Sequence, residues 1–245
     1  MKRYPLLAVL TFLLAAPPAQ AQEAPDATRV YVAYYQVAWG DLVEWLEIYQ
    51  ASWSSRLDAL VEAGEIVGYG AQIHNTGGIY NFRLAMRGTQ DTNYDRVWEE
   101  FMGTWMAEDP DSFNRVLALM DGHDDEIWNI DELVVTPGAA WQYMYDNQVE
   151  LAYSDWMGYT DRFKEAAGDL LEQARADGVI SGWVIESHNT GGRFNWKIMF
   201  LFPEWGDIHE FQTRMLAALP LDHPMWDAWK SHRDDIWETL PAGGN

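Results

Sequence analysis

The chain of 245 residues contains no cysteine. Disulfides, cysteine nucleophiles and thiolate metal ligands are therefore excluded, and so is a lipid anchor on a cysteine after a leader peptide. Stability has to come from burial of apolar surface, which a chain of this length can supply. The 14 Trp, 12 Tyr and 9 Phe fit that requirement.

Basic residues are scarce, because 16 Lys and Arg stand against 38 Asp and Glu, a formal charge of −22. Nucleic acids and anionic lipids need basic patches, so neither is expected as a partner. The acidic charge has two interpretations, a solvated surface or a surface that binds calcium or steers cations. No Asp-rich string has the spacing of an EF-hand loop, which favours the solvated surface.

Long apolar runs are absent beyond the N-terminus. Lys2 and Arg3 precede an apolar run of 11 residues, from Leu6 to Ala16, and small residues follow up to Ala21. A bilayer needs about 20 apolar residues, so this pattern is typical of a secretory signal peptide and not of a membrane span. We predict a signal peptide at 1–21, an extension at 22–28, and no membrane insertion. Loss of Lys2 and Arg3 makes the formal charge −24, and we expect a bacterial periplasmic or extracellular protein.

Common catalytic motifs are also missing. The sequence has no Gly-x-Ser-x-Gly elbow, no phosphate-binding loop and no His-Glu-x-x-His helix. These absences argue against the usual hydrolase and nucleotide-binding classes.

What the chain does contain is an internal repeat. Residues 64–83 (GEIVGYGAQIHNTGGIYNFR) and 178–197 (GVISGWVIESHNTGGRFNWK) are identical at 9 of 20 positions with a constant offset of 114. Both contain His-Asn-Thr-Gly-Gly, here called the HNTGG string. A second, shorter similarity relates residues 123–128 to residues 232–237. We predict two units at 29–136 and 139–241, a joint at 137–138 and a C-terminal tail at 242–245.

Periodicity predicts the same element order in each unit. Strands are expected at 29–37 and 141–145, followed by amphipathic helices from Asp41 to Gly64 and from Ser154 to Gly178. A hairpin turns at each HNTGG string. A second helix follows, carrying Val97 to Trp105 or Ile208 to Leu219, and a last strand is expected around 132–135.

Strand, helix, strand, strand, helix and strand is the order of a ferredoxin-like unit. Two such units resemble the dimeric α+β barrel superfamily, in which two antiparallel sheets pack face to face under outer helices. The resemblance implies an α+β fold with an intrachain barrel, so that one chain forms what relatives make by dimerising. That superfamily includes cofactor-free monooxygenases, small isomerases and haem-binding chlorite-dismutase-like enzymes. Fold alone does not decide among these functions.

Alternation along the hairpin strands places the polar residues on one face. If the barrel forms, that face points inward, where this superfamily has its pockets, so we predict a small-molecule site there. The predicted ligand-binding residues are Gln72, Asn81, Arg83, Glu186, Asn195 and Lys197.

The HNTGG string has two interpretations. Turn chemistry explains the asparagine, the threonine and both glycines, because these residues permit positive φ and hydrogen-bond the loop backbone. The histidine is the residue that the turn does not explain. An imidazole titrates near neutral pH, so we list His74 and His188 as candidate catalytic bases.

A second histidine pair, His123 and His232, lies in acidic surroundings. We interpret these segments as solvated helix ends or turns. If His74 met His123 and His188 met His232, each unit would hold two histidines and carboxylates suited to zinc, copper or iron; sequence separation does not decide this, and we predict no metal residue.

Haem is a further alternative that the resemblance raises. In chlorite-dismutase-like proteins one unit binds haem through a single proximal histidine, whereas the HNTGG string occurs in both halves. His188, His209 and His223 stay open as ligands, and the cofactor is left unassigned.

Three functions follow from the sequence. The first is a small-molecule site in the barrel, oxygenase-like or isomerase-like. The second is a metal or haem protein of the cell envelope. The third is an extracellular module that self-assembles as a homo-oligomer.

Overall fold

The computed structural model describes residues 27–241, so the predicted signal peptide and C-terminal tail lie outside the described residues. The strands are β1 (Arg29–Val37), β2 (Gly68–Thr76), β3 (Phe82–Gly88), β4 (Met120–Val135), β5 (Tyr143–Leu151), β6 (Gly182–Thr190), β7 (Trp196–Phe202) and β8 (Trp229–Thr239). The helices are α1 (Leu42–Ile48), the π-helical η2 (Tyr49–Trp53), α2 (Ser54–Glu62), α3 (Tyr94–Glu108), α4 (Pro110–Leu119), α5 (Tyr153–Trp156), α6 (Tyr159–Ala176), α7 (Trp205–Ala218) and the 3-10 helix η3 (Pro224–Ala228).

The eight strands form one closed barrel in the order β1-β3-β2-β8-β5-β7-β6-β4. Each unit contributes an antiparallel sheet with its first strand between its third and fourth strands. The barrel closes where the last strand of each unit pairs with the second strand of the other, β4 with β6 and β8 with β2. This confirms the predicted α+β class and the intrachain barrel, since one chain supplies both sheets.

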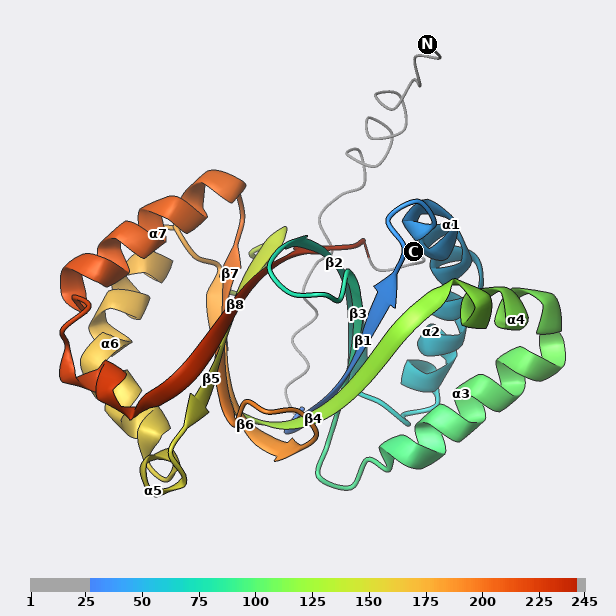
Figure 1. The fold of residues 1–245 in the computed structure, drawn as a ribbon, viewed down its shortest axis with the longest axis horizontal. Coiled ribbons are helices and arrows are strands. Elements are labelled where there is room, and N and C mark those ends of the chain that lie inside the picture. Colours follow the sequence, from blue (N-terminus) through green and yellow to red (C-terminus); the bar gives the residue numbers. More distant parts are fainter. Residues whose placement is uncertain (1–26, 242–245) are drawn as a thin grey trace, which may run out of the picture.

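Helices cover the outside of each sheet, as Figure 1 shows, with α1 to α4 on one side of the barrel and α5 to α7 on the other. Each helix layer encloses its own apolar core. The first is rich in aromatic rings, among them Tyr35, Trp45, Trp53 and Phe82, whose ring centroids lie 5.2 to 6.2 Å apart. Burial of these faces stabilises the fold, which leaves the barrel interior free to carry polar residues.

The offset of 114 holds well beyond the repeated string. Asn81 bonds the backbone of Val37, and Asn195 bonds that of Leu151 in the same way. In the last strands the offset changes to 109, because Trp128 lies opposite Val30 and Trp237 opposite Met144. The first three strands of each unit therefore correspond at the offset of 114, and β8 corresponds to the first part of β4 at the offset of 109.

Three expectations about elements were wrong. Residues 120–131 and 229–239 are strand, so His123 and His232 lie in β4 and β8 and not in helix ends or turns. Strand β4 has 16 residues and is much longer than the segment 132–135. Its run of Asp and Gly has low strand propensity, and pairing with β1 along that run overrides the preference.

The helices also depart from the prediction. The helix expected from Asp41 to Gly64 contains the π-helical segment η2, and the second unit begins its helix with the separate turn α5, followed by α6. Gly158, at φ 76°, separates α5 from α6. The strand expected at 141–145 runs from Tyr143 to Leu151.

None of the helices in the described part of the chain combines the length and the apolar character that a membrane crossing requires.

A substitution at Trp53 tests how much the aromatic core of the first unit contributes to stability. Its side chain is 2% exposed and contacts Tyr35, Trp45 and Trp105. We expect Trp53→Ala to lower the free energy of unfolding by about 3–5 kcal/mol, because it leaves a cavity among rigid rings. Trp39, which is 68% exposed, is the control, and Trp39→Ala should cost less than about 0.5 kcal/mol. Urea denaturation followed by circular dichroism measures both; equal losses would contradict this account.

Candidate functional site

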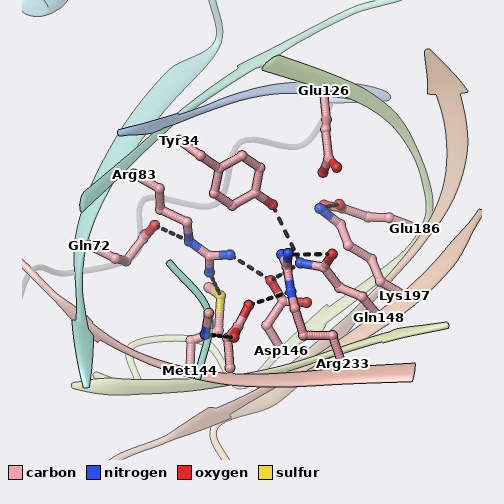
Figure 2. A network of polar contacts seen from close by, with 12 residues as sticks. Tyr34, Gln72, Arg83, Glu126, Met144, Asp146, Gln148, Glu186, Lys197 and Arg233 are labelled. Atoms are coloured by element: carbon pink, nitrogen blue, oxygen red, sulfur yellow. Dashed lines mark hydrogen bonds and ion pairs between the residues drawn. The ribbon is translucent and has the colours of Figure 1, made fainter. Parts of the chain in front are cut away.

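The barrel interior holds a network of buried charged and polar side chains, which Figure 2 shows converging from several strands. It includes Tyr34, Gln72, Arg83, Glu126, Asp146, Gln148, Glu186, Lys197 and Asp235, all buried, with the partly exposed Arg233 at its edge. The predicted residues Gln72, Arg83, Glu186 and Lys197 thus come together. The ligand role predicted for them stays a prediction.

Arg83 forms the first buried ion pair, across the barrel. Its Nη1 donates to Asp146 Oδ2 at 2.6 Å and its Nε donates to Gln72 Oε1 at 2.9 Å. Burial alone would raise the pKa of Asp146, but the positive charges of Arg83 and Lys197 outweigh burial and hold that pKa below its ordinary value. Asp146 is fully buried, and its Oδ1 has no hydrogen-bond partner among the described residues.

Lys197 forms the second buried ion pair. Its Nζ lies 2.7 Å from Glu186 Oε2, with the lysine 1% and the glutamate 3% exposed. Burial raises the pKa of Glu186 above its ordinary value, although Lys197 opposes that rise. A carboxyl group with a raised pKa is a stronger base than one in water.

The two cations of the buried ion pairs, Arg83 and Lys197, each also lie over a tryptophan from the other unit. The Arg83 guanidinium carbon is 4.5 Å from the ring centroid of Trp237, and Lys197 Nζ is 4.3 Å from that of Trp128. Both distances are within the range of a cation–π attraction, which strengthens where water is excluded. The two units therefore share one arrangement, a cation on the third strand held by the last strand of its neighbour.

The histidines of the HNTGG string contact these same tryptophans. The ring of His74 lies 5.1 Å from Trp237, and the ring of His188 lies 5.9 Å from Trp128. His188 Nε2 is hydrogen-bonded to the carbonyl oxygen of Gly191 in its own turn. The catalytic role predicted for these two histidines is untested, and their contacts support a part in joining the units.

The glycines of the string approach carboxylates from the other unit. The Gly78 N–H donates to Asp235 Oδ1 at 2.9 Å. Gly192, at φ 64°, lies so close to Glu126 that a Cβ would overlap its Oε1. Glu126 and Asp235 are themselves counterparts at the offset of 109. Both the φ angle and the lack of room explain glycine at position 192.

Asn81 and Asn195 lie at the start of each third strand, at the edge of this network. Asn81 Oδ1 accepts the Val37 N–H at 2.9 Å and its Nδ2 donates to the Val37 carbonyl at 2.6 Å. Asn195 makes the matching pair with Leu151, at 2.8 and 3.0 Å. Because backbone groups already engage both amide atoms, the geometry favours a structural role over the predicted ligand role.

The two hairpins carry aromatic rings toward the network. The rings of Tyr34 and Tyr80 are 5.7 Å apart, and the Arg233 guanidinium carbon lies 5.4 Å from the ring of Phe194. Tyr80 and Phe194 are counterparts at the offset of 114. Arg233 Nη2 also donates to Gln148 Oε1 at 3.0 Å, which links the partly exposed Arg233 to the buried residues.

Sequence reasoning missed Tyr34, Asp146, Gln148 and Arg233. Tyr34 and Gln148 are counterparts at the offset of 114, and a search for polar residues alternating along 143–151 would have found Asp146 and Gln148. Arg233 fell within a segment interpreted as a turn, so its inward direction was not expected.

The residues do not fit a metal centre or a haem. No group of three or more potential ligand side chains forms a metal site among residues 27–241. His123 packs against Tyr35 and His232 against Trp229, whereas His74 and His188 contact Trp237 and Trp128. Of the three histidines considered as haem ligands, His188 is hydrogen-bonded to Gly191 in its own turn, His209 is exposed on α7 and His223 caps η3.

Substitutions in the Arg83–Asp146 pair test how much this buried ion pair contributes to stability. We expect Asp146→Asn and Arg83→Met each to cost about 3–5 kcal/mol in the free energy of unfolding, because each leaves a buried charge unpaired. The double variant Arg83→Met/Asp146→Leu should cost less than the sum. Because the pKa of Asp146 is lowered, its contribution is present above about pH 4 and is lost as the pH falls through the folded-state pKa.

The control is Arg214→Met, which breaks a partly exposed pair with Asp177 and should cost less than about 1 kcal/mol. Urea unfolding at pH 7 and pH 3.5 measures all four proteins. Additive losses, or an Asp146→Asn loss that does not shrink at pH 3.5, would contradict the buried pair.

Gly192 tests the turn of the string. We expect Gly192→Ala to cost about 1–3 kcal/mol, because a Cβ would meet Glu126 at a positive φ. Gly64, at φ 73° with open space around it, is the control for φ alone, and Gly64→Ala should cost about 1 kcal/mol. Thermal unfolding of the two variants compares them. A smaller loss at Gly192 than at Gly64 would show that the contact with Glu126 is not tight.

Comparison with known proteins supports the fold alone. No family model matches the chain, and no curated protein matches it. Similar solved structures include a monooxygenase-like protein from Lactobacillus acidophilus (11% identity, TM-score 0.56, covering 89% of this chain and 98% of that one). An anthrone oxidase-like protein is also similar (8% identity, TM-score 0.56, covering 91% of this chain and 94% of that one). So is chlorite dismutase from Candidatus Nitrospira defluvii (8% identity, TM-score 0.55, covering 89% of this chain and 93% of that one). The chain has the dimeric α+β barrel fold of these proteins, built from two units of a single polypeptide.

Proposed function

We propose that the barrel interior binds a small organic molecule and that Glu186 removes a proton from it, as a cofactor-free oxygenase or isomerase requires. The observation that carries the proposal is the buried pair of Glu186 and Lys197, in which a carboxyl group of raised pKa lies 2.7 Å from an ammonium group. A base and a cation held together out of water suit proton abstraction from carbon or from a phenol.

The proton would pass from the substrate to the Glu186 carboxylate, leaving an enolate or phenolate. Lys197 and Arg83 supply the positive charge that stabilises this anion in a site of low dielectric. In an oxygenase the carbanion would add to O2 to form a carbon–oxygen bond and, with one proton, a hydroperoxide. Loss of water from that hydroperoxide yields a ketone. In an isomerase the proton would return from Glu186 to a second carbon.

Substrate would enter near Arg233, where Tyr80 and Phe194 come from the two hairpins. Arg233 is the interior cation with the most exposed side chain, at 31%. The rings of Tyr80 and Phe194 lie in the hairpin turns, so they can be displaced without a change in the barrel strands. Loops that cover a site commonly move in this way. The signal-peptide pattern supports the further proposal that the protein acts outside the cytoplasm.

Anthrone is a suitable probe, because its methylene protons are acidic and an anthrone oxidase-like protein shares the fold. Without O2, we expect the protein to accelerate exchange of these protons with D2O, measured by mass spectrometry. In air, uptake of O2 with formation of anthraquinone would identify the oxygenase, and exchange without uptake the isomerase type.

Glu186→Gln should slow both reactions by at least about 100-fold, the usual effect of losing a general base. The rate should fall on the acid side at a pH above the ordinary range of Glu, because the pKa of Glu186 is raised. Glu62→Gln, on the exposed end of α2, is the control. Exchange at equal rates in the native protein and Glu186→Gln would contradict the proposal.

A further inference from the structure

Arg87 lies near the end of β3 that is remote from the hairpin turn. It alternates with Met86, which packs in the outer core, so its side chain points into the barrel as that of Arg83 does. Arg87 forms no hydrogen bond or ion pair with any other residue of 27–241, whereas each of the other arginines in that range has at least one such partner. Within the described chain its positive charge is therefore unpaired, although the protein is strongly acidic.

The Arg87 guanidinium is also withdrawn from water. Burial lowers its pKa below the ordinary value of arginine, and no neighbouring charge offsets that effect. The guanidinium lies over Gly68 on the adjacent strand, where a Cβ would come 3.0 Å from its Nη2. An arginine that only solvates a surface keeps its charged group in water, so this position indicates a cation held for a negatively charged ligand.

The second unit is closed at the equivalent place. Strands β2 and β3 pair in the same register as β6 and β7, so the strand pairing itself defines counterparts for four inward residues at this end. In the first unit all four are partly exposed, and in the second all four are buried. The counterparts are Gly68 and Gly182, Gly70 and Val184, Ala85 and Met199, and Arg87 and Leu201. The first unit thus leaves its inner face around Arg87 accessible, where the second covers it with apolar side chains.

The surroundings of Arg87 select the class of ligand. Val30, which is paired with Arg87 across β1 and β3, and Ala85 belong to the apolar cluster inside the barrel. A single guanidinium balances one negative charge, and its planar fork matches a carboxylate. A phosphate group carries nearly two negative charges at neutral pH, so the acidic protein would oppose it more strongly. A monocarboxylate with an apolar body fits best.

We propose that Arg87 binds the carboxylate of such a ligand, and that this ligand is the substrate of the reaction proposed for Glu186. Arg83, beside the ion pairs, is four residues from Arg87 along β3, a separation of about 13 Å between α-carbons. The carboxylate therefore lies remote from the reacting carbon, with the apolar body between them. The identity of the ligand as substrate rests on the proposed function, whereas its binding at Arg87 does not.

Octanoate is the probe, and octan-1-ol is the matched uncharged control, both titrated into the protein by isothermal calorimetry. We expect octanoate to bind at least about tenfold more tightly, because the alcohol offers the guanidinium no charge. Arg87→Met should remove this preference. Arg214→Met, on α7 outside the barrel, should leave it unchanged. Equal binding of the two ligands by the native protein, or an unchanged preference in Arg87→Met, would overturn the proposal.

Thermal unfolding separates a ligand-binding role of Arg87 from a structural one. Arg87→Met should leave the unfolding midpoint unchanged or raise it, because no described partner loses a bond and an unpaired charge is removed. A drop as large as that of Arg83→Met would show that Arg87 has a structural role and would contradict the proposal.

The double variant Gly70→Val/Ala85→Met gives the first unit the side chains of the second and keeps Arg87. A Cβ at position 70 meets only Gln72 Nε2, at 3.4 Å, so we expect the variant to fold, by circular dichroism, and to bind neither ligand. Octanoate binding retained by the folded variant would place the ligand elsewhere and overturn the proposal. Because octanoate has no acidic C–H bond, its binding and the anthrone exchange proposed above succeed or fail separately.

Discussion

The pairing of each unit's last strand with the second strand of the other unit is the constraint on which the rest of the molecule depends. It brings Trp237 beside β2 and Trp128 beside β6, inside the barrel. Each tryptophan then contacts the histidine of one HNTGG string and lies under one interior cation. Without this exchange of strands neither Arg83 nor Lys197 would be enclosed, so the charged interior is a product of the contact between units and not of either unit alone.

Such an interior is not what a chain would adopt for stability. Replacing buried ion pairs by apolar side chains is often neutral or stabilising, because desolvation opposes the attraction. This protein has enough apolar burial elsewhere, since each helix layer encloses its own core of aromatic and aliphatic residues. The fold thus separates two tasks: the outer layers stabilise the barrel, and the stability they provide allows Glu186 and Asp146 to remain inside it.

The sequence predicts the barrel and part of its polar interior, and the contacts that it misses have a common cause. The duplicated element order, through its resemblance to the dimeric α+β barrel superfamily, predicted the barrel. Alternation along the hairpins, which is a local signal, then predicted the inward direction of Gln72, Arg83, Glu186 and Lys197. The partners of these residues are not local. Asp146 is 63 residues from Arg83 and meets it only because β5 lies across the closed barrel. Strands β4 and β8 were missed in large part because their polar residues have low strand propensity, which pairing with β1 and β5 overrides.

The duplication itself separates scaffold from chemistry. Features that recur in both units, such as Asn81 and Asn195, the string glycines and the two tryptophans, join strands or units, and a contact that the fold needs twice is retained twice. Features that differ lie within the barrel, where Tyr34 is matched by Gln148, Val32 by Asp146 and Asp124 by Arg233. Since both copies meet the same structural demands, the fold does not require these differences. They mark the positions that distinguish the second copy from the first. By this reasoning His74 and His188, which recur in both copies, belong with the scaffold. The carboxylates without a carboxylate counterpart, Asp146 and Glu186, belong with the function.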